Sequence, residues 1–226
     1  MSSRMDMIRA VLWMEGHSFL RNWRNLVTVA IMPLSAAFAS FMFVSDMESD
    51  LPANWGLGIS AALVMWIVPV IIAPRIFSHE RVENAQASVL ATPISVAELF
   101  IGKALAVFLF SYLAVLIGVI ATICALRIST GMLPDVCTFT MALLAMPACG
   151  LAVAEVIGGL CFLMGRADLV IFIGTFVELG PLVWIGGVRT TTSSVWVFLA
   201  VTAVGLAAAV AVPLLFSRLS KTTLAR

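Results

Sequence analysis

Two glutamates, Glu155 and Glu178, stand inside long apolar runs of this 226-residue chain. A charged side chain in hydrocarbon is costly, so such a residue usually faces a cavity or is protonated and hydrogen-bonded. At 1.5 Å per helical residue, each carboxyl lies about 12 to 13 Å from the end of its run. Either the two line a cavity for a polar or cationic substrate group, or each bonds a backbone carbonyl or a hydroxyl such as that of Thr175.

The other reactive side chains form no recognisable catalytic or metal-binding pattern. The four cysteines lie within or at the ends of apolar runs without a close pair, which is typical of small buried hydrophobic residues. His17 and His79 have no cluster of Cys, His or acidic residues beside them, and a G-x-S-x-G motif is absent. Gly102-Lys103 is followed by Ala104, so it is not a P-loop. We therefore expect no enzyme activity, cofactor or metal in this chain.

The composition predicts that the solvent of this chain is lipid. Hydrophobic residues make up 62% of it and charged residues 11%, and the mean hydropathy is +1.11. Soluble domains carry about a quarter charged residues, so a soluble fold would leave too much apolar surface exposed. The net charge of +1 gives no indication of nucleic-acid binding. We expect one membrane domain, with no room for a soluble catalytic domain beside it.

Six apolar runs are long enough to cross about 30 Å of hydrocarbon, which predicts an all-α protein with six transmembrane helices. Residues 1–25 would form a cytoplasmic interfacial helix, 26–216 the membrane domain and 217–226 a cytoplasmic tail. Gly180 and Pro181 would break the fifth span by a kink or by short re-entrant helices. The predicted spans are residues 26–45, 56–73, 99–126, 138–163, 169–188 and 195–216.

The distribution of basic residues predicts that both termini are cytoplasmic, because Lys and Arg concentrate in cytoplasmic loops. Eleven basic residues fall on the side that holds the termini and the 74–98 segment, against two on the other side. The first loop of that other side is acidic, with Asp46, Glu48 and Asp50. The eleven are Arg4, Arg9, Arg21, Arg24, Arg75, Arg81, Lys103, Arg166, Arg218, Lys221 and Arg226, and the two are Arg127 and Arg189.

Residues 4–24 are predicted to form a basic amphipathic helix that lies in the headgroup plane. At about 100° per residue, five apolar side chains share a narrow arc, with Asp6, His17, Arg21 and Arg24 roughly opposite. Such a helix is either a general surface anchor or an elbow that sets the angle of the first span and contacts a partner. The five apolar residues are Met5, Ile8, Leu12, Phe19 and Trp23.

The longest polar interval, between the second and third spans, has a helical pattern from Glu80 to Leu90. Thr92-Pro93 would end that helix, because the residue before proline is disfavoured in the α region. Ser95 and Glu98 then form an S-x-x-E capping box directly before an apolar run, so the third span should begin at Val96. The short helix at 80–91 is either an ordinary loop helix or a lever on the cytoplasmic surface. Its candidate contact residues are Glu80, Arg81, Val82, Ala85, Val89 and Leu90.

The run Val-Leu-Ala-Thr-Pro-Ile-Ser-x-x-Glu-Leu-x-x-Gly-Lys-Ala at 89–104 resembles the type-2 ABC export permeases. That family has a basic elbow helix, six spans, and a coupling helix between spans two and three that is followed by such a motif. The family's E-x-x-x-G-T-x-E pattern is replaced here by Glu83-Asn-Ala-Gln-Ala-Ser88, which leaves the subfamily open. The haem-exporter permease of cytochrome c maturation has a similar size and layout.

The resemblance implies a plasma-membrane (inner-membrane) protein that works as a dimer with a second copy or a related permease. Each permease would sit on a separate ATPase subunit, two copies in all, which would hold the ATP and Mg²⁺. Closure of the ATPases would push on residues 80–91 and reopen the cavity between the spans outward. An alternative of another class is an integral-membrane scaffold or sensor subunit that transports nothing. The substrate class stays open.

The basic-residue bias predicts which loops an impermeant thiol reagent reaches in intact cells. Single cysteines at Ser49 and Ser193, in a background without native cysteines, should be labelled from outside, because both positions fall in predicted external loops. A cysteine at Ser88 should be protected in intact cells and labelled after the membrane is permeabilised. External labelling at position 88 would overturn the predicted orientation.

Overall fold

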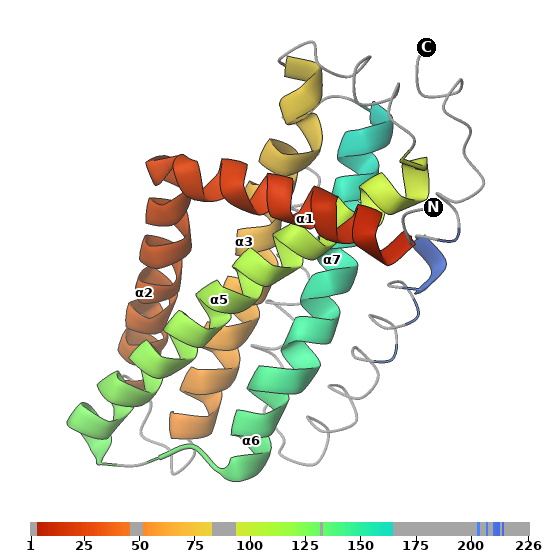
Figure 1. Ribbon diagram of the computed structural model, residues 1–226. Coiled ribbons are helices and arrows are strands. Elements are labelled where there is room, and N and C mark those ends of the chain that lie inside the picture. The colour runs from red at the N-terminus through yellow and green to blue at the C-terminus, as the bar shows by residue number, and fades with distance from the viewer. Residues whose placement is uncertain are drawn as a thin grey trace.

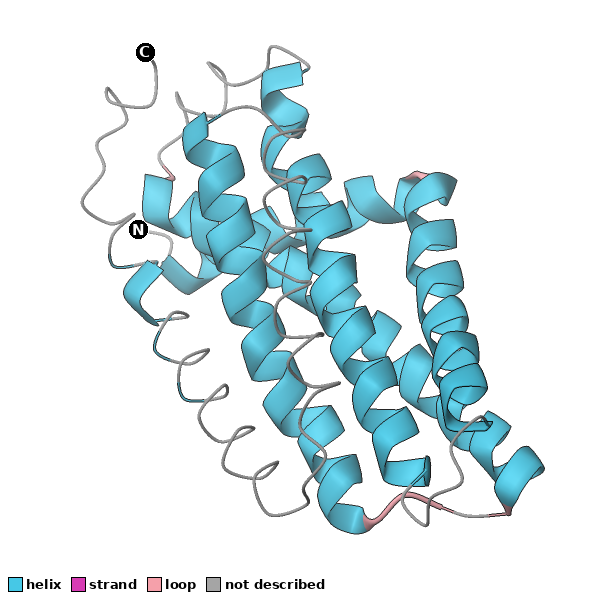
Figure 2. Ribbon diagram, turned by 180° about the vertical axis from the view of Figure 1, so that it is seen from behind, coloured by secondary structure: helices cyan, strands magenta, loops and turns pink. Residues whose placement is uncertain are grey.

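The computed structural model describes residues 4–45, 52–82, 94–131 and 133–164, together with positions 203, 207, 210–212 and 214. Every regular element within these residues is a helix, and they contain no strand (Figure 2). The predicted all-α class is therefore observed in this part of the chain. The predicted spans 169–188 and 195–216 lie outside it, apart from the single positions just named.

Helix α1 (Arg4–Arg21) lies across one end of the bundle, and α2 (Trp23–Ser45) turns away from its end to run along the bundle (Figure 1). Asn22 separates the two helices. Its side-chain oxygen accepts a hydrogen bond from the backbone N–H of Arg24 at 3.1 Å, as an N-cap residue does. The predicted amphipathic helix therefore ends before Trp23, which belongs to α2, the helix that contains the predicted first span.

Helix α3 (Pro52–Val82) is longer than the predicted second span. Its 31 residues extend about 46 Å, more than the hydrocarbon thickness of a bilayer. The apolar part runs over Gly56–Phe77, and the helix continues through Pro69 and Pro74. Arg75 and its neighbours were predicted to begin a polar segment between helices, but they form the last turns of α3.

Helix α5 (Val96–Thr130) begins where the S-x-x-E spacing predicts. Ser95 accepts a hydrogen bond from the Glu98 N–H at 3.2 Å, and the Glu98 carboxylate accepts one from the Ser95 N–H at 2.9 Å. Gly131 ends the helix with a φ of 69°, and its N–H bonds the Arg127 carbonyl. The stretch Val96–Ile128 and the apolar part of α3 are the two described segments long and apolar enough to cross a membrane.

The predicted fourth span corresponds to three consecutive elements: α6 (Val136–Thr140), a π-helical segment at Met141–Ala145 and α7 (Met146–Met164). Asp135 caps α6, since its carboxylate accepts a hydrogen bond from the Thr138 N–H at 2.8 Å. Pro147 explains the π segment. Proline has no N–H to donate and its ring crowds the carbonyl four residues earlier, so the helix widens just before it.

The core of the described bundle lies where α3 and α5 pack against each other and against α2 and α7 (Figure 1). Two glycines allow close approach. A Cβ at Gly102 of α5 would lie 2.6 Å from the Val11 side chain of α1, and a Cβ at Gly158 of α7 would collide with the Phe77 ring of α3. Small residues at these points let the helices pack by close contact.

Candidate functional site

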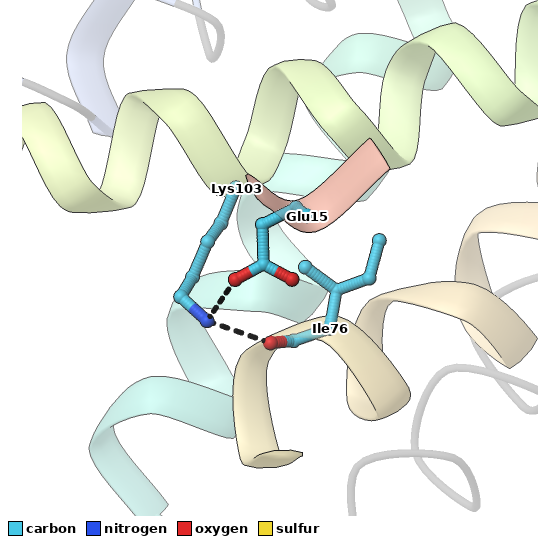
Figure 3. Close-up of polar contacts among 3 residues, drawn as sticks. All are labelled: Glu15, Ile76 and Lys103. Carbon is cyan, nitrogen blue, oxygen red and sulfur yellow. Dashed lines mark hydrogen bonds and ion pairs between the residues drawn. The ribbon is translucent and has the colours of Figure 1, made fainter. Parts of the chain in front are cut away.

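The strongest polar feature of the described structure is a buried lysine at the end of the bundle where α1 lies. Lys103 is two turns into α5, and none of its surface is exposed. Its Nζ lies 2.8 Å from the Glu15 Oε1 of α1 and donates a hydrogen bond of 2.8 Å to the Ile76 carbonyl of α3 (Figure 3). One ammonium group therefore joins three helices, and we call this contact the first tie.

The first tie corrects the predicted role of Lys103. It was counted among the basic residues of a cytoplasmic loop, but it is a core residue of α5. Without it the basic count is still ten against two, so the bias is unchanged in direction. Burying an ammonium group requires a charged partner and further hydrogen bonds, because its desolvation costs several kcal/mol. Glu15, which is 5% exposed, supplies the opposite charge.

The face that α1 turns to the bundle differs from the predicted one. Its centre is Val11, Glu15 and Phe19, at i, i+4 and i+8. Ile8 and Leu12 are half-buried at its edge, as predicted, whereas Met5 is exposed. The apolar-arc argument placed Asp6, His17, Arg21 and Arg24 opposite the arc and gave Glu15 no position, so it missed an acidic residue on the buried face. An acidic residue spaced between Val11 and Phe19 was the available signal that this face holds an ion pair.

Aromatic packing holds α1 beside the first tie. The Phe19 ring of α1 stacks on the Phe110 ring of α5, with centroids 3.9 Å apart. Trp13, on the other side of α1, is 76% exposed, and Leu20 and Trp23 are exposed as well. These apolar side chains beside Arg9, Arg21 and Arg24 agree with a helix that lies at a membrane surface.

A second tie connects α1 and α3, which the first tie also joins, through Asn25 of α2. Its side-chain oxygen accepts a hydrogen bond from the Arg75 guanidinium of α3 at 2.9 Å, and its amide group donates to the Phe19 carbonyl of α1 at 3.4 Å. Arg75 precedes Ile76, and Phe19 lies one turn after Glu15. The two ties therefore connect adjacent residues of α3 with consecutive turns of α1.

The predicted coupling residues flank these ties in sequence. Glu80, Arg81 and Val82 form the last turn of α3, whose backbone continues into them without a break. Ala85, Val89 and Leu90 lie outside the described residues, so a separate helix at 80–91 stays a prediction. Ser95 and Glu98 form the capping box of α5. The undescribed residues 83–93 thus leave from the end of α3 and return at the start of α5.

Glu155 is buried in α7, with 5% of its surface exposed. Within the described part of the chain, its Oε2 has no hydrogen-bond partner. Glu155 lies along α7 between Gly150, which faces Met65 of α3, and Gly158, which faces Phe77. Glu178, Gly180 and Pro181 lie outside the described residues, so the structure neither joins nor separates the two glutamates. Among the described residues, no backbone carbonyl bonds the Glu155 Oε2, as one of the two predicted alternatives required.

Metal ligation has no support in the described part of the chain. Among those residues, no three His, Cys, Asp or Glu side chains come together as metal ligands. Cys124 is exposed on α5 and Cys161 is buried in α7, and both are free thiols.

A family comparison covers most of the helices described above. The sequence model for "ABC-2 family transporter protein" matches residues 21–167, well over half of the chain. The match begins at the last residue of α1 and extends past the end of α7. No curated protein matches the chain.

The first tie predicts non-additive effects of substitution on stability. Lys103→Met or Glu15→Met alone takes the opposite charge of the ion pair away from the member that stays buried, and should cost about 3–5 kcal/mol. The double variant Glu15→Met/Lys103→Met removes both charges and should recover most of that loss, because apolar side chains can replace a buried ion pair. Thermal unfolding of the purified proteins in lipid nanodiscs, followed by tryptophan fluorescence, measures the stabilities of the single and double variants. Additive losses in the double variant would show that the two charges are not coupled.

Proposed function

The chain belongs to the ABC-2 family of transporter proteins, and we propose that it is the membrane-spanning permease subunit of an ATP-driven exporter. The observation that carries this proposal is the family match over α2 to α7, which include two helices long and apolar enough to span a bilayer. The chain is a membrane protein, and its family implies a partner subunit that hydrolyses ATP. The export direction follows the resemblance of residues 89–104 to the type-2 export permeases.

We place the α1 end of the bundle at the cytoplasmic surface. There, α1 lies across the bundle with Trp13 and Trp23 exposed beside arginines, a composition suited to the headgroup region. Six spans then bring both termini to the cytoplasm. In this orientation α3 and α7 run inward, α2 and α5 run outward, and residues 83–93 face the cytoplasm.

Residues 80–91 are the proposed docking element for the ATPase. The two helices that flank this element are held firmly. The capping box fixes the start of α5, and the two ties hold the end of α3 against α1 and α2. A short element between two fixed helices can transmit a push to the membrane domain. The active assembly contains two ATPase subunits and a second permease, either a copy of this chain or a related one.

Glu155 is the proposed contact for a polar or cationic part of the substrate, with Glu178 as its second acidic partner. A carboxyl that is buried in the membrane domain without a bond to Oε2 lowers stability, so we infer that its benefit lies in binding. The acidic pair would favour amines and other cations over anions.

Purification of the tagged full chain from its native membranes tests the proposed assembly. A permease subunit should co-purify with a chain that carries a G-x-x-x-x-G-K-[ST] motif, and the complex should hydrolyse ATP in a vanadate-sensitive manner. A monomeric, ATPase-free preparation from gently solubilised membranes would favour a scaffold or sensor that transports nothing.

Charge on the docking face should disrupt the complex. Val89→Asp or Leu90→Asp forces an unpaired carboxylate into the interface, which costs about 3–5 kcal/mol, or more than about a hundredfold in affinity. Glu83→Ala, off that face, is the matched control and should retain the ATPase. Gel filtration measures whether the ATPase stays bound, and ATP-hydrolysis assays measure the activity of the complex. An intact, active complex in both Asp variants would show that the ATPase docks elsewhere.

Glu155 should limit stability and support transport. Glu155→Leu should raise the melting temperature, since it removes a desolvated carboxyl whose Oε2 is unbonded, and should lower the stimulation of ATP hydrolysis by cationic compounds in the reconstituted complex. Glu155→Gln, similar in size, is the control for shape. Destabilisation by Leu but not by Gln would reveal a hydrogen-bond partner of the carboxyl and would contradict the substrate role.

A further inference from the structure

We propose that α1, residues 75–76 of α3 and the first turns of α5 move as one rigid unit, with Lys103 and Asn25 as its positioning residues. This inference rests on the proposed function, because the unit would receive the force that the ATPase applies to residues 80–91. Its consequence is that α1 follows the docking element instead of serving as a passive membrane anchor.

The first tie gives the unit its centre. Lys103 belongs to α5, yet its ammonium group bonds α1 through the Glu15 carboxylate and α3 through the Ile76 carbonyl, each at 2.8 Å (Figure 3). Because the group is wholly buried, no water is at hand to replace either partner if the helices separate. Opening the tie would break the contacts to Glu15 and Ile76 inside a dry interior, so a closed tie is favoured in every state of the cycle.

The second tie prevents α1 from pivoting about the first. Asn25 joins the Phe19 carbonyl to Arg75, one turn along α1 from Glu15 and one residue along α3 from Ile76. Two bonds at different points along α1 restrict rotation more than one bond does. Asn25 lies in the first turn of α2, so the second tie also brings the start of α2 into the unit.

Apolar contacts on both sides of Glu15 hold α1 along α5. Val11 packs on Gly102, where a side chain larger than hydrogen would collide, and Phe19 stacks on Phe110. These contacts and the ion pair are spread over two turns of α1. Rigid elements joined at several points transmit displacement as a body, whereas a single flexible contact does not.

The undescribed residues 83–93 connect the two tied helices, α3 and α5. A displacement of the docking element therefore acts on both helices where the ties hold them, and it carries α1 and the start of α2 with them. Without the ties, the end of α3 could move while α1 stayed in the headgroup layer.

Distance measurements between α1 and α3 test this unit. Spin labels are placed in a cysteine-free background at Met5, which is exposed on α1, and at Gly58 of α3, where a Cβ meets nothing within 4 Å. The full chain is reconstituted in nanodiscs with its ATPase. Double electron-electron resonance then measures the distance between the two labels without nucleotide and after trapping with ATP and vanadate. We expect one narrow distribution whose mean shifts by less than about 5 Å, one helical turn, between the two states.

Two variants identify what holds the unit. Glu15→Met/Lys103→Met removes the first tie without leaving a charge, and Asn25→Leu removes the second. Either should broaden the distribution and let the mean differ between the two nucleotide states. The matched control, Ser60→Ala/Thr122→Val, deletes a buried hydrogen bond of 2.8 Å between α3 and α5 outside the α1 contact and should behave like wild type.

Three results would overturn the inference. A wild-type mean that shifts by more than a helical turn on trapping would show that α1 and α3 move separately. Distributions as narrow in both tie variants as in wild type would show that the ties do not hold the unit. Equal broadening in the Ser60/Thr122 control would reduce their role to general stability. Absence of any co-purifying ATPase would instead refute the proposed function. The widths of the distance distributions recorded without nucleotide would still show whether the ties hold α1.

Discussion

The arrangement of the α1 end depends on the burial of one ammonium group. Lys103 is enclosed by an apolar bundle, and the cost of removing its charge from water is offset only where a carboxylate and a carbonyl meet it together. This requirement is geometric. It brings Glu15 of α1 and Ile76 of α3 to one point, and thereby determines where α1 crosses α3 and α5. Apolar packing alone would permit many positions along α5, whereas the ion pair permits one.

The hydrogen bonds of Asn25 lie at the same end of the bundle as the Lys103 contacts. Asn25 and Arg75 extend the network to α2, and the capping box completes the first turn of α5. Hydrogen bonds in such a setting add directionality that apolar contacts lack. The residues between α3 and α5, where the resemblance to export permeases implies the coupling helix, are therefore bordered by helix ends that an ion pair and hydrogen bonds hold in place.

The interior of the bundle presents the opposite case. Ser60 and Thr122 bond each other, and Ser111 bonds its own helix through the Val107 carbonyl. Glu155 stands apart from these satisfied groups, because it is buried and its Oε2 bonds none of the residues that the structure describes. Membrane helices seldom retain an acidic residue in such a position unless it serves a transported species or a second ionisable group. The neighbouring π segment and Pro147 mark the same helix as locally irregular, a feature often found near functional sites.

Hydropathy and local motifs determined much of this protein without reference to tertiary structure. The all-α class of the described residues and the start of α5 at Val96 follow from apolar run length and an S-x-x-E spacing, because each depends on neighbours in sequence. The tertiary structure decided the partners of the charged residues. Lys103 was predicted to be a loop cation, and no local signal reports that it meets Glu15, 88 positions away, in a dry interior. For the same reason the inward face of α1 was predicted only in part. Apolar periodicity identifies which residues avoid water, but a buried ion pair is specified by the opposite charge on another helix.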